Sequence, residues 1–164
     1  MEIYTDGSCK GNPGAGGWGF AVYDTDHSVL ATQWGGTSQT TNNRMELTAI
    51  LRALEWLFTS TTPATPDVTI VTDSTYCHQG LTRWLPGWRA NNWRRADGRT
   101  NVLNCDLWRA LDDGMRRAAE AGYNVRTRWV RGHSTCAGNN HADMLSNMFH
   151  KSSSDSSSAA SGTS

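Results

Sequence analysis

Four acidic residues occupy positions in this sequence where a carboxylate is costly to bury: Asp6, Glu46, Asp73 and Asp143. The first and the third each end a run of apolar and β-branched residues, and the second begins the apolar stripe of a predicted helix. A carboxylate packed against a core is destabilising unless something pairs with it. Several together are expected where divalent cations neutralise them, so the pattern points to a metal-dependent phosphoryl-transfer enzyme.

Acidic side chains that meet in space can hold two hard cations through oxygen ligands. Two such ions about 4 Å apart can stabilise both the attacking and the leaving oxygen of a phosphodiester displacement. Asp6, which is centrally placed, is the natural bridging ligand, with Glu46 and Asp73 beside it and Asp143 completing the shell of the second ion. Because all of these ligands are oxygen, Mg²⁺ is the expected ion and Mn²⁺ its substitute.

His133 lies in a predicted loop after the last strand-like segment. A loop histidine close to metal ions could pass a proton to the leaving group or assist product departure. On spacing alone, an ordinary surface histidine is the better interpretation.

A basic, aromatic segment lies between positions 83 and 99, with five arginines, one acid (Asp97) and the tryptophans Trp84, Trp88 and Trp93. Basic residues interleaved with aromatic ones indicate nucleic-acid binding, although the formal net charge of the chain is zero. The alternative is a solvated helix whose tryptophan face belongs to the core, and for Trp84 the two interpretations are equally supported.

The elements that must position the carboxylates begin with an antiparallel meander. Strands are predicted over residues 1–8, 18–23 and 28–34, with turns over 11–17 and 24–27 and a loop over 35–41. The glycines of the first turn invite a phosphate-cradle interpretation, but the Gly-Lys-Ser/Thr ending of a P-loop is missing, so a tight hairpin is preferred.

A helix over residues 43–58 presents Glu46 on its apolar face, toward the sheet. The strand that follows, residues 68–72, pairs most easily in parallel with the first strand, because a helix crosses between them. Asp6 and Asp73 then lie side by side at an end where open α/β sheets bind ligands.

The second half of the chain adds a short helix near Ser74 and a helix over residues 104–121, with Leu107, Leu111 and Met115 facing inward. A fifth strand is predicted over residues 125–130, followed by a polar loop over 132–140 and a short helix that carries Asp143. The sequence therefore predicts an α/β fold.

Composition bounds the remaining possibilities. The 164 residues fit one domain, predicted over 1–150, followed by a Ser-rich tail over 151–164 that is expected to be disordered. No apolar run could span a membrane and no secretory signal is evident, so a cytoplasmic protein is expected. Four scattered cysteines are expected to stay thiols. A monomer is the default expectation.

Four segments together resemble type 1 ribonuclease H: TDGSCKGNPG at 5–14, TNNRMEL at 41–47, TDSTY at 72–76 and WVRGH at 129–133, with Asp143 ten residues further on. The resemblance runs from the start of the chain to about residue 149 and is specific because the motifs occur in order. It implies a ribonuclease H-like fold, in which a five-stranded mixed sheet, with an antiparallel meander and parallel strands, is flanked by helices. It also implies an endonuclease that cuts the RNA strand of RNA–DNA hybrids, leaving 5′-phosphate and 3′-hydroxyl ends.

Carried over by position, the resemblance makes Asp6, Glu46, Asp73 and Asp143 the metal-binding catalytic acids and His133 the histidine of the catalytic loop. It implies that hybrid-contacting polar residues are Cys9, Asn12, Asn42, Asn43 and Gln79. Thr41 and Asn104 match a pocket for a DNA-strand phosphate, and Asn139 supports the catalytic loop. The segment 84–99, with Trp84, Trp88, Arg94 and Arg95, matches a basic protrusion that grips the hybrid backbone.

Four departures from the family pattern affect substrate contacts or the end of the chain. The protrusion carries arginine where lysine is frequent. Gln39 stands where an arginine is frequent, and Thr75 stands where a glutamine is frequent. The C-terminal helix is shortened and followed by the Ser-rich tail.

Two other functions were weighed against a hybrid-specific nuclease. A DNA-cutting enzyme of the transposase or resolvase kind is disfavoured by the polar residues Asn42 and Asn43 and by the short chain. A non-catalytic hybrid-binding module is disfavoured because it would have no reason to keep four acids.

Overall fold

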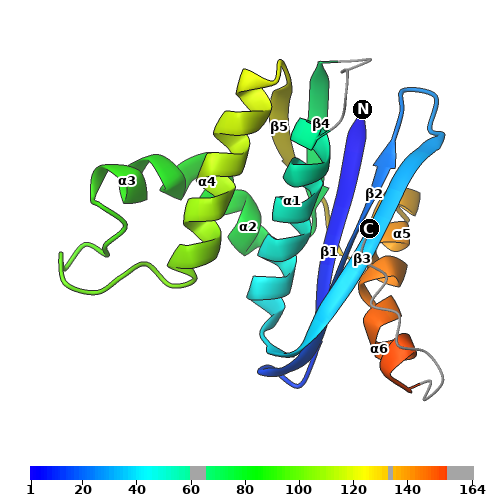
Figure 1. Ribbon diagram of the computed structural model, residues 1–164, viewed down its shortest axis with the longest axis horizontal. Helices are drawn as coiled ribbons and strands as arrows, with labels where there is room; N and C mark the ends of the chain where they lie inside the picture. The colour runs from blue at the N-terminus through cyan, green and yellow to red at the C-terminus, as the bar shows by residue number, and fades with distance from the viewer. Residues whose placement is uncertain (60–65, 133–134, 155–164) are drawn as a thin grey trace.

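The computed structural model describes residues 1–59, 66–132 and 135–154. The predicted five-stranded mixed sheet forms its centre, with the strand order β3-β2-β1-β4-β5 (Figure 1). The strands are β1 (Glu2–Lys10), β2 (Gly14–Tyr23), β3 (Val29–Thr40), β4 (Asp67–Thr72) and β5 (Asn124–Trp129). The first three pair antiparallel, and β4 is parallel to both β1 and β5.

The meander is longer than the sequence pattern predicts. The predicted turn over 11–17 and loop over 35–41 are wrong in extent, because β2 begins at Gly14 and β3 continues to Thr40. Glycine within these strands permits close packing rather than ending the strand. A Cβ on Gly36 would lie 2.2 Å from the Phe149 ring, and a Cβ on Gly16 would lie 2.4 Å from Cγ2 of Thr40.

Helices cover both faces of the sheet. The helix α1 (Asn42–Thr59) packs on one face and contacts α4 (Cys105–Glu120), whereas α5 (Ala137–Ser146) packs on the other (Figure 1). Strand alternation divides β1 between them, since Ile3 joins the main core and Tyr4 packs with Val71 and Ala142. The parallel pairing of β1 with β4 confirms the predicted crossover.

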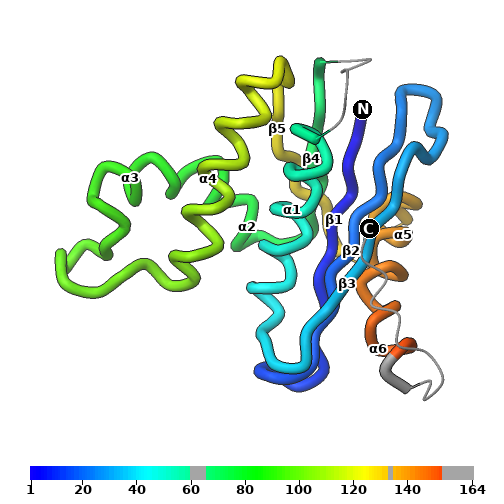
Figure 2. Tube along the Cα trace, in the orientation of Figure 1, coloured from blue at the N-terminus to red at the C-terminus, as the bar shows by residue number. Residues whose placement is uncertain are grey.

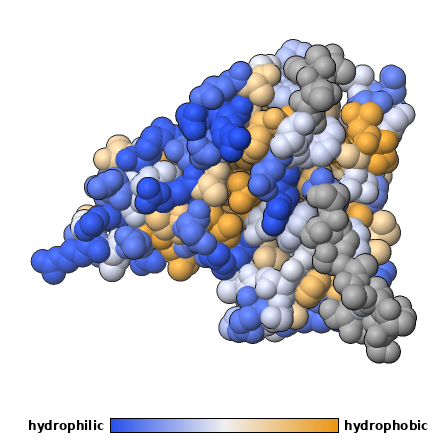
Figure 3. Space-filling view, viewed as in Figure 1, coloured by the Kyte–Doolittle hydropathy of each residue, from blue (hydrophilic) through white to orange (hydrophobic). Residues whose placement is uncertain are grey.

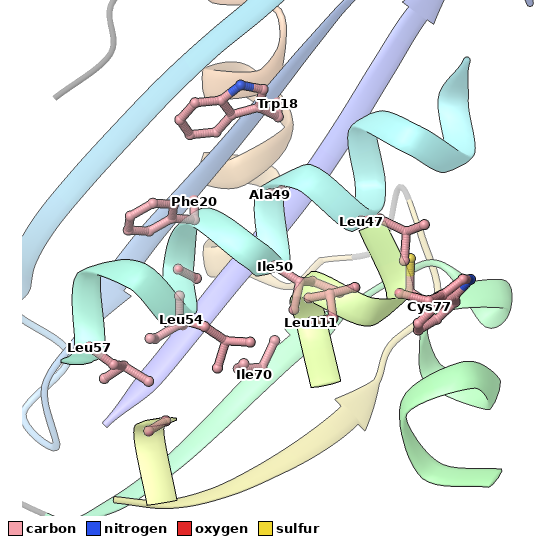
Figure 4. Close-up of a cluster of buried hydrophobic side chains, with 14 of the residues drawn as sticks. Trp18, Phe20, Leu47, Ala49, Ile50, Leu54, Leu57, Ile70, Cys77 and Leu111 are labelled. Carbon is pink, nitrogen blue, oxygen red and sulfur yellow. The ribbon is translucent and has the colours of Figure 1, made fainter. Parts of the chain in front are cut away.

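The main core lies between the sheet and α1. Phe20, Ile50, Leu54 and Ile70 are fully buried there, and Leu111 reaches them from α4 (Figure 4). The largest fully buried side chain of α4 is Trp108, which the predicted inward stripe omits. Of that stripe Leu111 is fully buried, whereas Leu107 and Met115 are only partly buried. A Cβ on Gly80 would lie 2.0 Å from the Trp108 ring, so this glycine makes room for the indole.

A protrusion leaves the body between β4 and α4. After β4 the chain forms α2 (Thr75–Gln79) and a π-helical stretch η1 (Gly80–Trp84). The protrusion, residues 84–99, then contains α3 (Leu85–Ala90) and most of the loop that returns to α4 (Figure 2). Trp88 packs on Trp108 with ring centroids 5.1 Å apart, and Trp93 is buried. A two-pronged contact between Arg89 and Asp112 also fastens α3 to α4. Trp88 and Trp93 therefore have a packing role, whereas Trp84 is exposed on its outer side and rests on the Trp88 ring with centroids 5.6 Å apart.

The described residues after β5 are more helical than predicted. The predicted loop over 132–140 is shorter, because α5 begins at Ala137. A last helix, α6 (Met148–Ser154), packs on β2 and β3 and crosses the predicted boundary at residue 150. Residues 155–164 of the predicted tail lie outside the described residues. Within the described ranges, no helix combines the length and the apolar character needed to cross a bilayer.

Candidate active site

Three carboxylates from three elements meet at one end of the sheet. Asp6 comes from β1, Glu46 from the first turns of α1, and Asp73 from the residue after β4. One carboxylate oxygen from each lies within 4.8 Å of the others. Asp6 and Glu46 are almost completely buried, at 5% and 7% exposure. Such a cluster of like charges is unfavourable unless cations or protons neutralise it.

Glu46 is held against the strand by a backbone contact. The Gly7 N–H donates a hydrogen bond to Oε1 of Glu46. A Cβ on Gly7 would lie 2.4 Å from the backbone nitrogen of Glu46, so the approach of α1 to β1 requires glycine here. The second carboxylate oxygen, Oε2, is buried and has no hydrogen-bond partner among the described residues.

Electrostatics at the cluster favour neutralisation of charge. The pKa of Asp6 is raised to about 7, chiefly by burial and also by the nearby carboxylates of Asp73 and Asp143. Burial and the charge of Asp6 hold the pKa of Glu46 well above its usual range. A cation would replace these protons, and the unpartnered oxygen of Glu46 provides a ligand for it. The residues present therefore fit a hard divalent metal.

Asp143 approaches the cluster from the opposite face of the sheet. It lines the same pocket, and its charge raises the pKa of Asp6, although it is not one of the three carboxylates grouped within 4.8 Å. Glycines set its position: Gly19 pairs with Asp6 across the sheet, and its Cβ would lie 2.5 Å from that of Leu145. The helix α5 can therefore pack close enough to β2 to bring Asp143 beside Asp6.

The loop after β5 passes next to Asp73. The Trp129 indole donates a hydrogen bond of 3.0 Å to the Asp73 carbonyl, and a Cβ on Gly132 would lie 2.9 Å from Oδ2 of Asp73. His133, the predicted catalytic-loop histidine, lies outside the described residues.

The carboxylates line an open pocket of about 480 Å³. Six of the predicted substrate-binding or metal-binding positions besides Asp6 lie at its wall, with further residues that sequence reasoning missed: Ser8, Ser74 and Asn147. A sequence signal existed for two of them. Ser74 follows Asp73 directly, and Asn147 lies four residues after Asp143, which places it on the same helical side.

Comparison with known proteins settles the family. The family model named RNase H matches residues 1–149. This chain belongs to the ribonuclease H family. The ribonuclease H of Thiobacillus denitrificans is 47% identical to it over 148 residues, which cover 90% of this chain and 91% of that protein. The ribonuclease H of Albidiferax ferrireducens is 46% identical over 147 residues, with 90% and 91% covered.

Solved structures agree with this fold. LC9-RNase H1, described as a type 1 RNase H with the type 2 active-site motif, has a TM-score of 0.73 at 28% identity. The match covers 99% of this ribonuclease H and 84% of that chain. LC11-RNase H1, solved in complex with RNA/DNA hybrid, has a TM-score of 0.66 at 24% identity, with 90% and 94% covered. At 24% identity, the likeness to LC11-RNase H1 concerns the fold alone.

Four of the five predicted hybrid-contacting residues of this ribonuclease H lie at the pocket or are hydrogen-bonded to its wall. Cys9, Asn42 and Asn43 line it, and both asparagines are exposed. Asn12 connects to them, because its Oδ1 accepts a 3.1 Å hydrogen bond from the Asn42 N–H. Gln79 is half-buried at the end of α2 and does not line this pocket.

Thr41 and Asn104, the predicted phosphate-pocket residues, share one neighbour. The Arg44 N–H donates to Oγ1 of Thr41 at 3.3 Å, and the Arg44 guanidinium donates to Oδ1 of Asn104 at 3.3 Å. Asn104 in turn donates to the Tyr76 hydroxyl at 3.2 Å. The guanidinium of Arg44 also pairs with Asp106, a residue that sequence reasoning did not connect with this region.

The other predicted residues lie farther along the same molecule. Arg94 and Arg95 are exposed on the protrusion, whose outer end is hydrophilic (Figure 3). Asn139 is buried in the first turn of α5, and its Oδ1 has no hydrogen-bond partner in the described part of the chain. It therefore offers a buried hydrogen-bond acceptor at the start of α5.

Proposed function

We propose that this ribonuclease H is an endonuclease that hydrolyses the RNA strand of RNA–DNA hybrids with divalent metal ions, leaving 5′-phosphate and 3′-hydroxyl ends. The observation that carries the metal dependence is the group of Asp6, Glu46 and Asp73 within 4.8 Å, with a buried, unpartnered oxygen on Glu46. Membership of the ribonuclease H family supports the proposed reaction. LC11-RNase H1 was solved with such a hybrid, which supports the substrate.

Asp6, Glu46, Asp73 and Asp143 would hold the metal ions, with Mg²⁺ as the expected metal and Mn²⁺ as its substitute. When bound, two hard cations stabilise the developing charge on the attacking and leaving oxygens of the phosphodiester. Asp6 faces each of the other acids, so it is the residue suited to bridge two ions. The clustered carboxylates destabilise the metal-free protein when they are ionised. The raised pKa of Glu46 reflects this, because its ionised form is disfavoured in the folded state.

The chain itself positions the hybrid. The side chains of Cys9, Asn42 and Asn43 provide polar groups at the pocket wall, where they can meet the 2′-hydroxyls and base edges of the minor groove. The 2′-hydroxyl distinguishes RNA from DNA, so these residues account for the choice of the RNA strand. Arg94 and Arg95 on the protrusion would contact phosphates.

His133 is proposed to move a proton at the leaving group or assist product departure. The described loop beside it, with Gly132 close to Asp73, supports this role. Replacement of His133 by alanine is expected to slow the reaction without abolishing it, because the carboxylates remain.

Cleavage of an end-labelled hybrid tests the proposal, with duplex RNA, duplex DNA and chelator-treated reactions alongside. Cleavage restricted to the RNA strand of the hybrid, and dependent on added Mg²⁺ or Mn²⁺, is expected. Cleavage that persists in chelator would exclude the metal mechanism. Equal cleavage of duplex DNA would instead favour the DNA-cutting alternative, and metal-independent binding without cleavage would favour a binding module.

A further inference from the structure

A second pocket adjoins the catalytic one and carries positive charge. It has a volume of about 300 Å³ and is lined by Lys10, Asn147, His150 and Lys151. The chain contains only two lysines among its fifteen basic residues, and both line this pocket. None of its described lining residues is acidic. Two like charges on a protein surface have no general reason to line the same pocket. Their arrangement here points to an anion as the ligand.

The pocket is built from separate elements. Lys10 ends β1, Asn147 lies between α5 and α6, and Lys151 is in α6. His150 is buried between them, and its Nε2 lies 3.3 Å from the Ser8 hydroxyl. The same hydroxyl donates to the Ser146 carbonyl at 3.1 Å. These contacts fix α6 against β1, while both lysine side chains remain exposed to solvent.

The basic pocket is continuous with the catalytic one. Asn147 lines both pockets, and its Nδ2 donates a 2.8 Å hydrogen bond to the Asp143 carbonyl. Ser8, which contacts His150, also lines the catalytic pocket. The two pockets therefore share a wall at Asn147 and lie next to each other.

The location separates this pocket from the protrusion. In Figure 1, α3 lies at the left and α6 at the lower right, with the carboxyl end of β1 and the start of α1 between them. Phosphate contacts on both sides of the carboxylates would hold a duplex across the pocket rather than at one end of it.

We propose that Lys10 and Lys151 bind a backbone phosphate of the cleaved RNA strand, next to the phosphodiester at the carboxylates. This inference rests on the proposed function, because it requires a hybrid in the catalytic pocket. The contacts are ionic and made to the backbone, so they contribute to binding without selecting a sequence.

The first test removes the charges in the full chain. In Lys10→Gln/Lys151→Gln, the KM for the hybrid at about 0.1 M salt should rise about fivefold, and kcat should change less than about twofold. The slope of log KM against log salt should fall by about one to two. Lys10→Arg/Lys151→Arg keeps the charge and should retain both quantities. Arg126→Gln, which removes a charge from the exposed edge of β5, should leave them unchanged.

The second test locates the phosphate. Hybrids carrying one uncharged methylphosphonate linkage, placed in turn along each strand, are compared between wild type and the Gln variant. One linkage in the RNA strand, adjacent to the cleaved bond, should raise the KM of the wild type but not that of the variant. A sensitive linkage only in the DNA strand would overturn the strand assignment.

The possible failures are distinct. A wild type that cuts no hybrid contradicts the proposed function itself. A wild type that cuts hybrid, together with a Gln variant of unchanged KM and salt slope, overturns the phosphate site alone. Equal impairment of the Arg and Gln variants would also overturn it, because charge would then not be the property that matters.

Discussion

Asp6 is buried and faces other carboxylates, and both properties disfavour its ionised form in the metal-free protein. Its predecessors in β1 alternate between two cores, which fixes its direction, and Asp73 follows the strand that pairs in parallel. The sequence predicts this meeting because both acids end apolar runs. Asp143 could not be placed in this way, because its position depends on how closely α5 packs against the glycines of β2.

Asp6→Asn is expected to reduce turnover of the hybrid by at least about a hundredfold, because it removes the negative charge best placed to bridge the cations. Binding of the hybrid should persist, since the predicted substrate contacts lie on other residues. Single-turnover cleavage and fluorescence anisotropy with a labelled hybrid measure the two effects separately. Near-normal turnover in this variant would refute the bridging role.

Gly7→Ala tests the close approach of α1 to the strand. The new Cβ would meet the backbone of Glu46 at 2.4 Å and that of Met45 at 2.5 Å, and neither backbone atom can move independently. We expect a loss of about 1–3 kcal/mol in the free energy of unfolding and a marked loss of activity. Urea unfolding and hybrid cleavage are the measurements.

Gly87→Ala is the matched control for that substitution. Gly87 lies in α3, and a Cβ there would have no heavy atom within 4 Å. Its stability should therefore stay the same or rise slightly, because alanine favours helix. An equal loss in both variants would mean that glycine flexibility, rather than the contact with Glu46, is responsible.

At the scale of elements, the order of strands and helices follows from hydrophobic periodicity, and their ends do not. Periodicity places α1, β4 and the parallel pairing correctly. The ends of β2 and β3 depend on residues such as Gly36, where the missing side chain is filled by Phe149, more than a hundred positions away. The inward face of α4 likewise depends on the space that Gly80 leaves for Trp108. Such tertiary fits have no local signature.

Packing fixes the protrusion to the body, and its exposed arginines are the charges expected to contact the hybrid. Neutralising its exposed arginines in Arg94→Gln/Arg95→Gln/Arg99→Gln should raise the KM for the hybrid and reduce the salt slope of binding by about one to three. The fold should be unaffected, because Trp88, Trp93 and the pair of Arg89 with Asp112 remain. Titrating labelled hybrid at several salt concentrations measures the slope.

Arg116→Gln on α4 is the control for the protrusion variant, because it removes an exposed charge that is paired with Asp113 and Glu120. Its salt slope should equal that of the wild type. An unchanged slope in the triple variant would count against the protrusion as a phosphate grip and leave its tryptophans with a packing role alone.

For the whole molecule, the carboxylate cluster makes stability depend on pH in a particular direction. The pKa of Asp6 is raised from 3.8 to about 7 in the folded protein, chiefly by burial, so the folded state binds more protons than the unfolded state between these values. The free energy of unfolding therefore falls as the pH rises from about 4 to about 7. The contribution of the Asp6 proton to stability is complete below about pH 4 and is lost above about pH 7.

Asp6→Asn removes this titration and should flatten the pH profile in chelator. At pH 4 the variant should be about as stable as the wild type, and at pH 8 it should be more stable by at most about 4 kcal/mol, since the raised pKa of Asp6 spans about three units of about 1.4 kcal/mol each. Urea unfolding from pH 4 to 8 measures the difference. Mg²⁺ should stabilise the wild type at pH 8 more than the variant, because a cation then takes the place of the lost proton. If the free energy of unfolding of the two proteins depended on pH in the same way in chelator, the raised pKa of Asp6 would be contradicted.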